Sequence, residues 1–195
     1  YQNPDCRLTN SSGAYGTTIS EHLIMVCLML LRRQMEYTEI IRAGGWETLS
    51  GGIRSLHGAR VTCLGTGDIG TEFARRAQAF HPACITGVRR TVRSSDPAFT
   101  SIHAIAELDS VLPETDLLVM ALPSTAETVG ILSRERIALL PDSAFVVNVG
   151  RGTAIDQEAL CDALNAGRLA GAALDVVVPE PLPADHPLRR AKNLL

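Results

Sequence analysis

Short, almost wholly apolar runs alternate along this chain with longer stretches in which apolar residues recur every three or four positions. The short runs are typical of strands buried on both faces of a sheet, and the longer stretches are typical of helices packed against it. Strands are predicted at residues 61–64, 84–88, 117–121, 145–149 and 169–174, with residues 193–195 as the start of a sixth. This alternation predicts a doubly wound α/β fold, a parallel sheet with helices on both faces.

The intervening stretches predict the helices. These are expected at residues 71–80, at residues 105–112, from Ser133 to Pro141 and from Asp156 to Gly167. Ser133 and Asp156 can each accept a hydrogen bond from a free N–H group of the first turn, and Gly167 suits the left-handed residue that closes a helix.

An apolar helix is predicted ahead of the first strand. Thr18 and Glu21 have the spacing of a capping box, which places its start at Thr18. Its unbroken apolar run, residues 23–31, is nine residues long, whereas about 20 are needed to cross a bilayer, so no membrane anchor is expected. Because the run is apolar nearly all round, protein is expected to cover both of its sides.

Composition narrows the class of protein. Of the 195 residues, 46% are hydrophobic and 20% are charged, which is typical of a globular protein. A net charge of −3 gives no indication of nucleic-acid binding. The cysteines are odd in number, scattered and never in a C-x-x-C pair, which favours reduced thiols in a cytoplasmic protein and gives no metal site; they are Cys6, Cys27, Cys63, Cys84 and Cys161.

The first predicted strand leads into a G-x-G-x-x-G motif at Gly65, Gly67 and Gly70, and a helix follows. This is the setting in which the motif binds a dinucleotide. Gly65 would form the tight turn, Gly67 would let the backbone approach a pyrophosphate, and Gly70 would let the helix pack closely on the strand. The alternative is a glycine-rich turn with a purely structural role.

A single ligand site is predicted at one edge of the sheet, because ligands of such folds bind beyond the carboxyl ends of the strands. The residues expected there are polar, charged or glycine-rich; they are residues 66–69, Arg89 and Arg90, residues 122–125, Gly150 and Arg151, and Asp175.

Arg89 lies 19 residues after Gly70, where NAD enzymes usually carry an acidic residue on the ribose 2′-hydroxyl. An arginine there suits the 2′-phosphate of NADP, so NADP is favoured and NAD stays possible. The alternative is a solvated basic turn, since Arg90 and Arg93 lie nearby.

Arg151, between two glycines, could donate paired hydrogen bonds to the carboxylate of an α-keto acid, or it could be an ordinary loop arginine. Glu180 lies between Pro179 and Pro181, which restrict its backbone. On these residues alone, Glu180 would be interpreted as an exposed loop carboxylate.

The order of motifs resembles the D-2-hydroxyacid dehydrogenases, which include phosphoglycerate dehydrogenases and glyoxylate/hydroxypyruvate reductases. The matching segments are Ser20–His22, Leu64–Gly70, Ala121–Thr128, Val147–Gly152 and Ala173–Pro181, which cover nearly the whole chain in family order.

The resemblance implies an NAD(P)-dependent oxidoreductase that transfers a hydride between C4 of the nicotinamide and C2 of a small 2-hydroxy or 2-oxo acid. It implies catalytic roles for Arg151, which would bind the 2-oxo acid, and for Glu180, which would pair with a catalytic histidine. The implied cofactor-binding residues are Gly65, Gly67, Asp68, Ile69, Gly70, Arg89, Arg90, Leu122, Pro123, Thr128, Val149, Gly150, Arg151 and Asp175. In the family the apolar leading helix contributes to a homodimer.

The chain also departs from the family pattern. The family's catalytic histidine falls beyond Leu195, and His186 lies in a different motif. Residues 1–17 are therefore expected to connect to a substrate domain outside the sequence, and residues 18–195 to form the NAD(P)-binding domain, able to bind cofactor but inactive alone. Asp68, an acidic residue beside a phosphate, is electrostatically unfavourable. The alternative function is a non-enzymatic, NAD(P)-sensing module like the C-terminal-binding corepressors, which share the fold.

Overall fold

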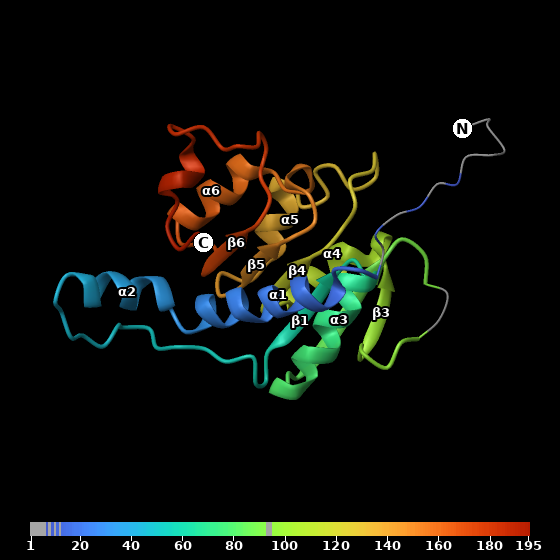
Figure 1. Ribbon diagram of the computed structural model, residues 1–195, viewed down its shortest axis with the longest axis horizontal. Coiled ribbons are helices and arrows are strands. Elements are labelled where there is room, and N and C mark those ends of the chain that lie inside the picture. The colour runs from blue at the N-terminus through green and yellow to red at the C-terminus, as the bar shows by residue number, and fades with distance from the viewer. Residues whose placement is uncertain (1–6, 8, 10, 12, 93–94) are drawn as a thin grey trace.

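The protein is described by a computed structural model that covers residues 7, 9, 11, 13–92 and 95–195. Cys6, Arg93 and most of the predicted connection at residues 1–17 lie outside the described residues. The described part is built on a six-stranded sheet in the order β3-β2-β1-β4-β5-β6 (Figure 1).

All neighbouring strands of this sheet are parallel. The strands are β1 (Arg60–Leu64), β2 (Cys84–Arg89), β3 (Ser101–Ala104), β4 (Leu117–Met120), β5 (Phe145–Asn148) and β6 (Gly171–Leu174). The chain order reverses direction between β1 and β4, which is the point where doubly wound sheets bind their ligands. The predicted fold class is confirmed.

Two details of the sheet differ from the prediction. Strand β3 was not predicted, because its sequence mixes polar and apolar residues and each of its four residues is only half-buried at the edge of the sheet. Residues 193–195 do run beside β6, where Ala172 donates to the Asn193 carbonyl and Leu195 donates to the Ala172 carbonyl, both at 2.9 Å. They form an isolated bridge and not a full strand.

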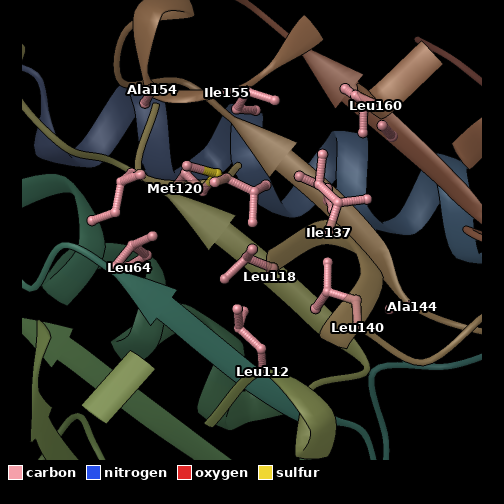
Figure 2. Packing of buried hydrophobic residues seen from close by; sticks show 14 of the residues in the cluster. Leu64, Leu112, Leu118, Met120, Ile137, Leu140, Ala144, Ala154, Ile155 and Leu160 are labelled. Atoms are coloured by element: carbon pink, nitrogen blue, oxygen red, sulfur yellow. The ribbon is translucent and has the colours of Figure 1, made fainter. Parts of the chain in front are cut away.

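The helices lie on both faces of the sheet (Figure 1). Helices α1 (Gly16–Leu31) and α3 (Asp68–Ala77) cover one face, and α4 (Leu108–Val111), α5 (Arg134–Leu139) and α6 (Gln157–Asn165) cover the other. Figure 2 shows the second of these cores, in which Leu118 and Met120 of β4 point toward Ile137 and Leu160 of the covering helices.

The predicted caps of α5 and α6 are confirmed. The Ser133 hydroxyl accepts a hydrogen bond from the Arg136 N–H group at 3.4 Å, and the Asp156 carboxylate accepts one from the Ala159 N–H group at 2.9 Å. Gly167 follows α6 with a φ of +71°, a value that only glycine adopts without strain.

The predicted start of the leading helix is wrong. Helix α1 begins at Gly16, two residues before the expected cap, and no side chain caps it. The Thr18 hydroxyl instead donates back to the Tyr15 carbonyl at 3.3 Å, within the first turn. The expectation that protein covers both sides is also not met within the described residues, because Met25 on the outer side is 50% exposed.

Beyond α1 the chain forms an arm, residues 34–53, which extends away from the sheet (Figure 1). It contains helix α2 (Gln34–Arg42), which has no buried residue, and the helix is followed by Gly44 at a φ of +74°. Two large apolar side chains of the arm are strongly exposed, Ile41 at 66% and Trp46 at 99%. Within the described part of the chain, no helix is both long and apolar enough to cross a membrane.

At the edge of the sheet opposite the carboxyl ends, an ion pair links the start of β1 to the residue before β4. The Asp116 carboxylate accepts three hydrogen bonds from Arg60, one from its backbone N–H group at 2.8 Å and two from its guanidinium at 3.1 and 2.9 Å. The guanidinium therefore holds the pKa of Asp116 below its usual range. This pair stabilises the start of β1 against the start of β4.

Candidate functional site

A cleft of about 380 Å³ lies at the carboxyl edge of the sheet. Eight of the predicted cofactor residues line it; they are Gly67, Asp68, Ile69, Leu122, Pro123, Val149, Gly150 and Arg151. They follow β1, β4 and β5, three adjacent strands, and so come together because parallel strands end at the same edge. The cleft is also lined by Ala121 and by Ser11, Tyr15 and Ile19, which come from the beginning of α1 and the residues before it; these four were not predicted as site residues.

Two of the three motif glycines are required by the packing of the protein itself. Gly65 has a φ of +107°, and a Cβ atom there would lie 2.7 Å from the Ala121 carbonyl oxygen. A Cβ atom on Gly70 would lie 2.0 Å from the Gly65 carbonyl oxygen, so only glycine lets α3 approach the turn this closely. The predicted roles of Gly65 in the turn and of Gly70 in helix packing agree with this geometry.

Gly67 is different, because no contact among the described residues requires it to be glycine. Its φ is −78°, which any residue can adopt, and a Cβ atom there would have no neighbour within 4 Å. It lies in the cleft immediately before α3, whose first N–H groups have no partners within the helix. Open space next to a helix N-terminus fits a dinucleotide pyrophosphate, and a side chain at this position would occupy that space.

The Asp68 carboxylate lies against the first turn of α1. A Cβ atom built on Gly16 would be only 2.5 to 2.7 Å from the three carboxyl atoms of Asp68. Asp68 is itself the first residue of α3, so its negative charge lies near the positive ends of two helix dipoles. These dipoles offset the charge and give a physical reason why an acidic residue is tolerated in the motif.

Asn148, the last residue of β5, forms side-chain hydrogen bonds to the backbone of the loop that carries Arg151. The Asn148 side chain is 1% exposed; its amide donates to the Arg151 carbonyl at 3.0 Å, and its oxygen accepts from the Gly150 N–H group at 3.0 Å. A Cβ atom on Gly150 would lie 2.6 Å from the Leu122 carbonyl oxygen, so the loops after β4 and β5 touch here. The exposed Arg151 side chain therefore projects from a fixed backbone into the cleft.

Glu180 lies on an adjacent loop. Its carboxylate accepts a hydrogen bond from the Val177 N–H group at 2.9 Å, and a Cβ atom on Gly152 would lie 2.3 Å from the Val177 carbonyl carbon. The loops that carry Arg151 and Glu180 are therefore in direct contact. Glu180 is exposed and does not line the cleft of the described residues.

Asp175, at the end of β6, lies in a smaller hollow of about 90 Å³. Its carboxylate is 3.9 Å from Nε2 of His22 on α1, a further residue whose place in the site was not predicted. Val149 lines both this hollow and the larger cleft, so the two are neighbours.

Three remaining predicted residues, Arg89, Arg90 and Thr128, do not line the cleft. Arg89 ends β2 and is half-buried, while Nη1 of Arg90 is 3.6 Å from Oε2 of Glu127. Thr128, in the loop after β4, is 7% exposed, and its hydroxyl donates to the Pro123 carbonyl of the same loop at 2.6 Å. Thr128 thus shapes the loop after β4. Among the described residues, no group of three His, Cys, Asp or Glu side chains could hold a metal ion.

The cleft, the glycine turn and the order of the strands are those of a dinucleotide-binding domain, and the family can be named. Residues 24–195 match the model of the D-isomer specific 2-hydroxyacid dehydrogenase, NAD binding domain, and the chain belongs to this family. It is similar to glyoxylate/hydroxypyruvate reductase B of Pectobacterium carotovorum, with 36% identity over 185 residues, which is 91% of this chain and 56% of the relative. The chain thus spans about half the length of the curated relatives it matches.

Solved structures agree with this family. A D-isomer specific 2-hydroxyacid dehydrogenase family protein of Aeromonas salmonicida superposes with a TM-score of 0.87 at 34% identity, over 99% of this chain and 62% of the other. A D-isomer specific 2-hydroxyacid dehydrogenase of Xanthobacter autotrophicus, in complex with NADPH and MES, superposes with a TM-score of 0.85 at 32% identity, over 98% and 78% of the two chains.

Proposed function

We propose that the described unit, from α1 to Leu195, is the cofactor-binding domain of an NAD(P)-dependent oxidoreductase that reduces a small 2-oxo acid to the D-2-hydroxy acid. Glyoxylate and hydroxypyruvate, which appear in the names of the curated relatives, are the first substrates to test. The observation that carries the proposal is Gly67, where the described part of the chain needs no glycine and the open space leaves room for a pyrophosphate in the same cleft as Arg151.

We assign the cofactor residues as follows. The N–H groups at the start of α3 would bind the pyrophosphate, with Gly67 allowing the approach. Leu122, Pro123, Val149 and Gly150 would form the walls of the cleft, and Asp175 would accept a hydrogen bond from the nicotinamide carboxamide. The bound nicotinamide supplies or accepts the hydride.

Arg151 is the proposed substrate-binding residue. Its guanidinium can donate paired hydrogen bonds to the carboxylate and the 2-oxo oxygen, which orients C2 and stabilises the negative charge that develops on that oxygen. Glu180 is the proposed partner of a catalytic histidine, whose imidazolium it would stabilise so that a proton can be delivered to the same oxygen. The contact between the loops of these two residues supports their action at one site.

NADP is the proposed cofactor, with NAD possible. Arg89, the last residue of β2, and Arg90, which follows it, can pair with a 2′-phosphate, and the Xanthobacter relative was solved with NADPH. The experiment is a titration of the chain with NADPH and with NADH, repeated on Arg89→Asp. We expect tighter binding of NADPH by the wild type and loss of that preference in the variant. Failure to bind either cofactor would refute the proposed function, whereas an unchanged preference in Arg89→Asp would refute only the role of Arg89.

We propose that the chain forms a homodimer through the outer side of α1 and the arm. Met25 of α1 and Ile41 and Trp46 of the arm are 50%, 66% and 99% exposed, and exposed large apolar side chains are candidates for an interface. Sedimentation should give a dimer at micromolar concentration, and Trp46→Ser with Ile41→Ser should shift it to monomer. A wild-type monomer would contradict this assignment.

The described cysteines are free thiols, which favours a location of the protein in the reducing cytoplasm.

A further inference from the structure

An ion pair crosses over the glycine motif. Strands β2 and β4 are not neighbours, because β1 lies between them. Arg90 follows β2, Glu127 lies in the loop after β4, and Nη1 of Arg90 is 3.6 Å from Oε2 of Glu127. A contact between these two loops has to span the carboxyl end of β1, where residues 65–70 turn into α3. The pair therefore lies at the place where the adenosine half of a dinucleotide must approach.

The backbone under Glu127 is fixed, although its side chain is free to move. The neighbouring Thr128 hydroxyl donates to the Pro123 carbonyl at 2.6 Å and accepts from the Thr125 N–H group at 2.8 Å, so the turn cannot shift without breaking these partly buried hydrogen bonds. The side chains of Arg90 and Glu127 are 76% and 64% exposed. An exposed pair of this kind is weak enough to exchange partners when a stronger anion arrives.

We propose that Glu127 is a specificity-determining residue that competes with the 2′-phosphate of NADP for Arg90 and thereby limits the preference for NADP over NAD. This proposal rests on the proposed cofactor function. A phosphate monoester carries nearly two negative charges and pairs with a guanidinium more strongly than a carboxylate does. Arg90 must leave Glu127 to bind the phosphate, and the freed carboxylate then repels the phosphate that replaced it. NAD has no 2′-phosphate and leaves the pair intact.

The test is Glu127→Gln, which keeps the shape of the side chain and removes its charge. We expect the dissociation constant of NADPH to fall about two- to fivefold, a size set by the modest strength of exposed ion pairs, while that of NADH changes less than twofold. The gain should shrink at high salt because both charges are exposed.

Two further variants show whether the effect acts through Arg90. In an Arg90→Gln background, Glu127→Gln should improve NADPH binding less than it does in the wild type, because only the direct repulsion between the carboxylate and the phosphate is then removed. Glu47→Gln, an equal change of charge on the exposed arm, should alter neither affinity. Unchanged NADPH affinity in Glu127→Gln, equal gains for both cofactors, or a full gain without Arg90 would each overturn the proposal while leaving the proposed function standing. A wild type that binds neither cofactor would refute both.

Discussion

Replacing Gly67 by alanine separates a requirement for folding from a requirement for the cofactor. The new methyl group would have no neighbour within 4 Å, and the φ of −78° suits alanine. The substitution lowers the conformational entropy of the unfolded chain, which stabilises the fold by about 0.4–1 kcal/mol. Alanine is also a poorer N-cap residue than glycine, which destabilises the fold by about the same amount. These terms nearly cancel, so the free energy of unfolding should change by less than about 1 kcal/mol.

Cofactor binding should respond differently. The methyl group would stand in the space where the pyrophosphate reaches the first turn of α3, so the affinity for NADPH should fall at least about tenfold, equivalent to about 1.4 kcal/mol. Isothermal titration calorimetry measures the affinity, and urea unfolding followed by far-ultraviolet circular dichroism measures the stability. Trp46 is 99% exposed and would be a poor fluorescent reporter of unfolding.

Gly70→Ala is the matched control. The same methyl group would lie 2.0 Å from the Gly65 carbonyl oxygen, so this variant should lose stability by several times more than Gly67→Ala. If Gly67→Ala bound NADPH as tightly as the wild type, or unfolded as readily as Gly70→Ala, the assignment of this glycine to the pyrophosphate would be wrong.

Three further outcomes are expected. Asn148→Ala leaves the buried Gly150 N–H group without a partner and removes one of the two hydrogen bonds to the Arg151 carbonyl, which should cost about 1–3 kcal/mol in urea unfolding; an unchanged midpoint would contradict the role of Asn148. The lowered pKa of Asp116 gives stability that is complete above the usual carboxyl pKa, about 3.9, and is lost as the pH falls through the folded pKa. Unfolding midpoints from pH 7 to pH 2.5 should therefore fall below about pH 4 in the wild type and less steeply in Asp116→Asn. Asp68→Asn removes a negative charge from the cleft and should tighten NADPH binding; weaker binding would mean that the carboxylate helps to hold the cofactor.

Much of the fold follows from apolar patterning. The strands buried on both faces are continuous apolar runs, and the caps of α5 and α6 come from local side-chain chemistry, so both were predictable. Strand β3 was not, because an edge strand is only half-buried and its mixed sequence matches no single period. The start of α1 was predicted wrongly because Thr18 and Glu21 have the spacing of a capping box. The helix begins at Gly16, which packs against the carboxylate of Asp68.

The site was predictable where its residues follow strands, but not where they belong to α1 or its start. Residues that follow strands were placed correctly on one edge, since parallel strands share that edge. Tyr15, Ile19 and His22 were missed, because they lie in α1 or directly before it, and the position of this helix beside the cleft is set by packing and not by any motif. The sequence shows Asn148 as a polar residue at the end of an apolar strand. Its role in holding the Arg151 loop depends on its burial, which the sequence does not show.

The central claim is that a dinucleotide pyrophosphate binds at the start of α3. The most direct measurement is a map of backbone amide chemical shifts of the isotopically labelled chain during titration with NADPH. We predict that the largest changes fall on the N–H groups of residues 67–69, with smaller ones at Gly150 and Arg151. Saturable changes that leave residues 67–69 untouched, or no changes at millimolar NADPH, would contradict the account.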